Sequence, residues 1–193
     1  MSRTGGMPRP VRTAGAEGAG GVAGAMGKPD GARAAEAAPG LTEAPALPVA
    51  LVRLVADLES LDRAARIEQL IAWADEFAEV PAGVAARPFA ESSRVPHCES
   101  DVHVFAVDRP DGTLAFHFAV ESRHGLSAKS WAVFLARTCT GQPLEQVARV
   151  SPDVIFRIFG QDLSMGKGQG LIGMLDLVTH AARSRLAARS EDR

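Results

Sequence analysis

The hydrophobic positions divide the chain into a long N-terminal stretch with few large apolar side chains and a remainder in which such side chains recur regularly. Glycine, alanine and proline dominate residues 1–46, so this segment has little apolar surface to offset the entropy of ordering its backbone. We therefore expect a disordered extension over 1–46 and a folded domain over 47–189. A transit peptide is the alternative interpretation of the extension, but its acidic residues argue against one.

Apolar residues at helical spacing predict two helices at the start of the folded part. The first is indicated by Leu51, Leu54, Val55, Leu58 and Leu61. Asp62 is placed to cap the second helix, and Pro81 is expected to stop it. The apolar stripe of this second helix consists of Ile67, Leu70, Ile71, Ala74 and Phe77. From Pro81 to His97 the pattern is irregular, which indicates a loop leading to Cys98.

Strict alternation of side chains then predicts two strands, over 102–107 and 113–120, joined by turn residues 109–112. The second strand has one strongly apolar face, which helices must cover. Helical spacing resumes at Trp131 and continues beyond a glycine-rich segment, 166–170, which we interpret as a flexible loop rather than a phosphate cradle. The order of elements predicts an α+β fold, with helices packed on an antiparallel β-sheet.

Composition and charge narrow the classes of function. The formal net charge of −2 provides no basic field for nucleic acid or anionic lipid, and no apolar run is long enough to span a membrane. We therefore expect neither nucleic-acid nor membrane partners. Two cysteines, Cys98 and Cys139, are fewer than a secreted disulfide framework usually has, which favours a reducing cytoplasm. They form no CxxC motif, which argues against a dedicated zinc site.

Cys98 is the candidate for chemistry because polar residues surround it at the junction between a loop and a strand. Structural cysteines more often occupy apolar stripes, as Cys139 does in the helix after the hairpin. Only a few per cent of an ordinary thiol is ionised near neutral pH. Arg94, His97 or Lys167 would raise the thiolate fraction, whereas Glu99 and Asp101 would lower it, and the sequence leaves the balance open.

The segment Cys98-Glu99-Ser100-Asp101-Val102 resembles the active-loop motif of the SufE family, and Arg94-Val95-Pro96 is similar to the family's approach to that motif. The resemblance implies a SufE/IscU-like fold and a non-enzymatic sulfur acceptor that carries a persulfide on Cys98. The implied partners are a cysteine desulfurase, which this protein would activate, and an iron–sulfur scaffold complex as the downstream acceptor. No cofactor is expected on this chain, because the pyridoxal phosphate belongs to the desulfurase.

The resemblance assigns supporting or partner-binding roles to residues around Cys98, namely Arg94, His97, Glu99, Ser100 and Lys167. The chain departs from the family pattern at His97, at His103 and at Lys167, which keeps the charge of the usual arginine but not its guanidinium fork. Two other functions stay open. One is a cysteine hydrolase that pairs Cys98 with His97, His103 or His117, and the other is an allosteric module that activates a desulfurase without carrying sulfur.

Overall fold

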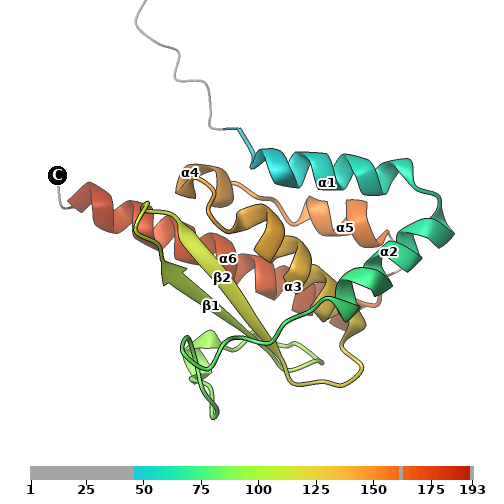
Figure 1. Cartoon of the computed structure of the whole chain (residues 1–193), viewed down its shortest axis with the longest axis horizontal. Helices are drawn as coiled ribbons and strands as arrows, with labels where there is room; N and C mark the ends of the chain where they lie inside the picture. Colours follow the sequence, from blue (N-terminus) through green and yellow to red (C-terminus); the bar gives the residue numbers. More distant parts are fainter. Residues whose placement is uncertain (1–45, 161–162, 192–193) are drawn as a thin grey trace, which may run out of the picture. The chain divides into compact units, whose positions relative to one another are not determined.

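The computed structural model describes residues 46–160 and 163–191. The expected disordered extension therefore lies, apart from its last residue, outside the described residues. The described chain has α-helices and an antiparallel sheet, which confirms the predicted α+β fold (Figure 1). In chain order its elements are α1 (Val49–Ser60), α2 (Arg63–Asp75), the 3-10 helix η1 (Glu91–Ser93), β1 (Val102–Asp108), β2 (Leu114–Val120), α3 (Leu126–Cys139), α4 (Leu144–Val147), α5 (Asp153–Phe159) and α6 (Met165–Glu191).

Strands β1 and β2 form the predicted hairpin, with Val102 paired to Val120 and Asp108 paired to Leu114. The apolar face of β2 is buried, as its alternation predicts. Helix α3 packs against β2, and α6 packs against β1, so these two helices cover the hairpin (Figure 1). Trp131 lies at the centre of the core, where its ring stacks on Phe134 at 5.1 Å between centroids.

The junction between α1 and α2 is tied together by side chains. Asp62 caps α2 as predicted, because its carboxylate accepts a hydrogen bond of 2.9 Å from the backbone N–H of Ala65. Arg66 donates to the carbonyl oxygens of Leu58 and Leu61 at the end of α1, and also to the carbonyl of Arg157 in α5. One guanidinium therefore satisfies carbonyl groups at the C-terminal ends of two helices.

The second helix differs from the sequence prediction in its end and in its buried face. It ends at Asp75 rather than at Pro81, because the following residues run beside the hairpin and the N–H of Val80 donates to the carbonyl of Phe118 at 2.9 Å. Ile67 and Ile71 are 48% and 41% exposed. Leu70, a member of the predicted stripe, is buried against α3, and Trp73, which lies outside that stripe, is buried with it.

Helix α6 begins at Met165, so the segment 166–170, interpreted above as a flexible loop, is helical. The far end of the same helix holds the tip of the hairpin. Arg185 pairs with Asp108 through a bond of 2.7 Å from its Nε, and Arg189 donates to the carbonyl of Gly112. No helix in the described part of the chain is both long and apolar enough to cross a membrane.

Candidate functional site

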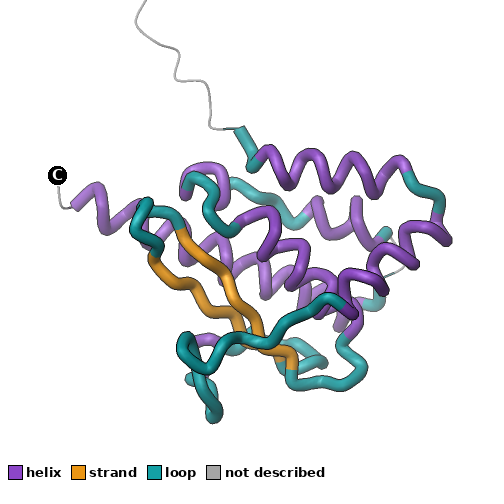
Figure 2. Tube along the Cα trace, viewed as in Figure 1, coloured by secondary structure: helices purple, strands orange, loops and turns teal. Residues whose placement is uncertain are grey.

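Cys98 lies in a short loop that is closed at its base by strand-like pairing. Arg94 forms an isolated antiparallel bridge with His103, and the N–H of Val95 donates to the carbonyl of Val102 at 2.8 Å. Figure 2 shows this loop leading into the first strand of the hairpin. Because β1 continues directly from the closed base, the position of Cys98 is set by the hairpin.

Within the loop, the backbone turns sharply on both sides of the cysteine. His97 and Asp101 both adopt positive φ angles, 54° and 46°, in the left-handed region that histidine and aspartate enter more readily than most residues. Arg94 spans the loop and donates from its Nε to the carboxylate of Asp101 at 2.8 Å. The sequence hypothesis placed Arg94 beside the thiol, but its guanidinium instead binds the acids Asp101 and Glu91.

The loop rests on a face of α6 that consists of glycines. A Cβ atom at Gly170 would lie 2.9 Å from the Cys98 sulfur, and one at Gly173 would lie 2.7 Å from Val95. A Cβ atom at Gly166 would overlap the carboxylate of Glu99. These glycines are spaced by four and three residues, so they share one face of the helix. They serve close packing rather than flexibility, which explains why the loop interpretation of 166–170 is wrong.

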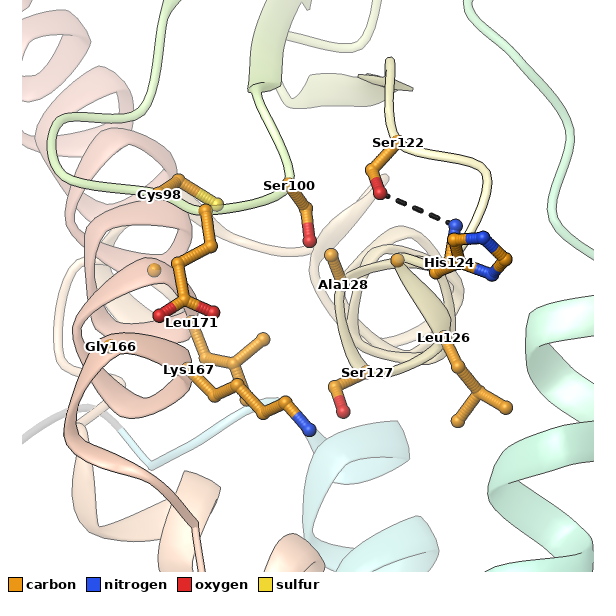
Figure 3. A pocket seen from close by; sticks show the side chains of 13 residues that line it. Cys98, Ser100, Ser122, His124, Leu126, Ser127, Ala128, Gly166, Lys167 and Leu171 are labelled. Carbon is orange, nitrogen blue, oxygen red and sulfur yellow. Dashed lines mark hydrogen bonds between the residues drawn. The ribbon is translucent and has the colours of Figure 1, made fainter.

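The sulfur of Cys98 opens on a cavity of about 450 Å³. The active loop, the segment from the end of β2 into α3, and the first turns of α6 form its walls (Figure 3). Lys167 extends from α6 toward Ser127 of α3, and the ring of His124 lies on the far side of Ser122 from Cys98. The lining residues are Cys98, Glu99, Ser100, Ser122, His124, Gly125, Leu126, Ser127, Ala128, Gly166, Lys167, Gly170 and Leu171.

The surroundings of Cys98 favour its protonated form. Burial of the half-buried thiol raises its pKa above the ordinary value, and the charges of Asp101 and Glu99 act in the same direction. The backbone N–H groups of Ser100 and Val102 lower the pKa, but their effect is smaller than that of burial. The sequence left open whether these charges raise or lower the thiolate fraction of Cys98, and the structure indicates that the protonated thiol is favoured.

The cavity brings together four of the six candidate site residues, namely Cys98, Glu99, Ser100 and Lys167. Arg94 is held in its ion pairs, as described above. His97 is exposed on the other side of the loop, where it lines a separate hollow of about 270 Å³ together with Pro96, Gln169, Ile172, Gly173, Asp176 and Leu177.

The histidines considered for a hydrolase do not share the cavity of Cys98. His103 is 7% exposed, its Nδ1 lies 2.9 Å from the hydroxyl of Ser93, and its ring contacts Phe89 and Phe105. His117 is half-buried on β2, as its place in the alternating strand predicts. The histidine that does line the cavity, His124, was not singled out from the sequence, because its segment has no motif or regular spacing.

Cys139 is fully buried in α3, as predicted. Burial raises its pKa to about 11, which keeps the thiol protonated. Within residues 46–160 and 163–191, no three side chains of histidine, cysteine, aspartate or glutamate come together in a way that could hold a metal ion.

Comparison with known proteins adds a family and a related structure. A family model described as SufE, Fe-S metabolism associated domain, matches residues 52–182, from within α1 to within α6. No curated protein matches the chain. The solution structure of a hypothetical protein from Thermus thermophilus is similar, with a TM-score of 0.59 and 23% sequence identity over 73% of this chain and 98% of that one. At this identity the similarity supports a shared fold.

Proposed function

Because the chain belongs to the SufE family of domains associated with Fe–S metabolism, we propose that it accepts sulfur from a cysteine desulfurase as a persulfide on Cys98. It then delivers that sulfur for iron–sulfur cluster assembly, and its binding raises the turnover of the desulfurase. The observation that supports this proposal is the exposure of the Cys98 sulfur to a cavity walled by the active loop, the start of α3 and the start of α6.

Sulfur transfer of this kind needs a thiolate that reaches the outer sulfur of the donor's persulfide. A new S–S bond forms at Cys98, and the donor's inner sulfur leaves with the electron pair of the broken bond. The N–H groups of Ser100 and Val102, which favour the anionic form of Cys98, support the thiolate at the moment of attack. The carrier supplies no cofactor, because the pyridoxal phosphate that releases sulfur from cysteine belongs to the partner.

The other candidate residues take supporting roles in this proposal. Lys167 offers a positive charge beside Cys98, and Glu99 and Ser100 complete that end of the cavity. Arg94 keeps the loop closed through Asp101, while exposed His97 faces the approaching desulfurase. We place the reaction in the cytoplasm, where thiols stay reduced.

The decisive experiment compares Cys98→Ser with Cys139→Ser after incubation with a cysteine desulfurase, pyridoxal phosphate and cysteine. Intact-mass spectrometry should show one added sulfur atom on the wild type and on Cys139→Ser, which strong reductant removes. Cys98→Ser should fold, gain no sulfur and lose most of its stimulation of the desulfurase. If Cys98→Ser stimulated the desulfurase as strongly as the wild type, the protein would instead be an allosteric module without a carrier role.

A further inference from the structure

Two opposite charges lie beside Cys98 at the same end of the cavity. The carboxylate of Glu99 packs against Gly166, where a Cβ atom would overlap it, and Lys167 is the next residue of α6. Both side chains are exposed and line the cavity. The ion pairs within the described part of the chain include neither Glu99 nor Lys167, so both groups remain available to a ligand.

The cavity is much larger than persulfide storage requires. A persulfide adds one sulfur atom to Cys98, whereas the cavity has a volume of about 450 Å³, within the range of pockets that bind small molecules. Its walls combine an apolar surface, formed by Leu171 and Ala128, with the hydroxyl groups of Ser100, Ser122 and Ser127. Figure 3 shows the labelled Ser100, Ser127 and Lys167 around this space.

We propose that the cavity binds a free α-amino-acid persulfide, of which cysteine persulfide is the simplest, as a second sulfur donor to Cys98. The ammonium of Lys167 binds the α-carboxylate of this ligand, and the carboxylate of Glu99 binds its α-ammonium group. The outer sulfur of the ligand then lies toward the Cys98 sulfur. This inference rests on the proposed function, because it uses Cys98 as the sulfur acceptor, and it adds a low-molecular-weight class of donor.

The transfer step balances without an added oxidant or reductant. The Cys98 thiolate attacks the outer sulfur of the ligand, so that a bond forms between these two sulfurs while the S–S bond of the ligand breaks. The electron pair of the broken bond stays on the inner sulfur, which leaves as a thiolate and takes up the proton that Cys98 released. The products are Cys98 persulfide and free cysteine.

The test loads the full-length protein without any desulfurase. Cysteine persulfide, generated from cystine and hydrosulfide, is mixed with the protein, and the added sulfur is followed by intact-mass spectrometry after rapid alkylation. The neutral probe is the persulfide of N-acetylcysteine methyl ester, which lacks both charges. We expect loading by cysteine persulfide to saturate with concentration and loading by the neutral probe to rise linearly.

Single substitutions test the two charged contacts proposed for the ligand. Lys167→Ala and Glu99→Gln should each raise the half-saturating concentration of cysteine persulfide about tenfold, as expected for the loss of one charge-assisted contact. Loading by the neutral probe should stay linear with concentration in both variants, and its slope then reports separately how each charge acts on the Cys98 thiol, whose pKa Glu99 raises. Lys129→Ala is the matched control, because Lys129 lies outside the cavity lining and its removal should leave both rates unchanged.

Loading by cysteine persulfide that rises linearly with concentration, as loading by the neutral probe does, would overturn the inference. If a desulfurase still loaded Cys98 under that outcome, the proposed function would stand alone. If cysteine persulfide saturated as expected but no desulfurase loaded Cys98, the inference would be supported and the proposed protein partner would be wrong.

Discussion

Replacing Gly170 with alanine should displace the Cys98 sulfur from the face of α6, whereas the same change at Gly168 should not. The new Cβ atom at position 170 would lie 2.9 Å from that sulfur. Ordinary van der Waals contact begins at 3.4 Å, so the sulfur has to move by about 0.5 Å or more. At position 168 a Cβ atom would meet nothing within 4 Å, which makes Gly168→Ala a matched control in the same helical turn.

The two variants separate the packing cost from the helix preference of alanine. Alanine is favoured over glycine in a helix by about 1 kcal/mol, and Gly168→Ala should gain up to that amount in the free energy of unfolding. Gly170→Ala has the same gain but also overpacks the loop, at a cost of about 1–3 kcal/mol. We therefore expect Gly170→Ala to be about 1–3 kcal/mol less stable than Gly168→Ala.

Guanidinium unfolding measures the stability difference, and alkylation by iodoacetamide with peptide mapping measures the reactivity of Cys98 separately from that of Cys139. A displaced thiol loses part of the burial that raises its pKa, so Cys98 should react faster in Gly170→Ala than in the wild type or in Gly168→Ala. Equal stabilities and equal alkylation rates in the two variants would show that the loop does not rest on Gly170.

Two further predictions concern groups away from the cavity. Burial raises the pKa of Cys139 from 9.0 to about 11, so the folded chain holds this proton more tightly, and the free energy of unfolding should fall by about 2–3 kcal/mol as the pH rises through that interval. Urea unfolding below and above this pH interval should show the decrease in the wild type but not in Cys139→Ala. If the free energy of unfolding depended on pH equally in both proteins, the assignment to Cys139 would be contradicted. Arg66→Met should lower the free energy of unfolding by about 1–3 kcal/mol, because the carbonyls at the ends of α1 and α5 lose their donor. Arg66→Lys should recover only part of the lost stability. A wild-type free energy of unfolding for Arg66→Met would exclude the capping role.

The sequence predicts the elements whose signals are local. The alternation along β2 predicts both the strand and its buried face, and the carboxylate of Asp62 marks the start of α2, because each depends on residues a few positions apart. The helical start of α6 was missed for the opposite reason. Gly166 and Gly170 have low helix propensity, and the contact that requires them comes from Cys98, which is distant in the sequence.

The candidate site also contains residues that the sequence indicated and residues that it did not. Cys98, Glu99 and Ser100 belong to one continuous motif, and Lys167 follows from its resemblance to a family position. Ser122 and His124 lie between β2 and α3, and Ser127 lies in the first turn of α3, so only the fold brings them to the cavity. The spacing of Gly166, Gly170 and Gly173 is the one signal in the sequence that would have indicated a helix face packed against another segment.

Helix α6 carries two attachments whose mutual orientation depends on the number of residues between them. Its first turns support the Cys98 loop through Gly170 and Gly173, and its last turns bind the hairpin tip through Arg185 and Arg189. One inserted residue between Gly173 and Arg185 would rotate one attachment about 100° relative to the other. Relatives that keep both attachments should therefore conserve the length of this stretch of α6, and insertions should collect in the loops instead.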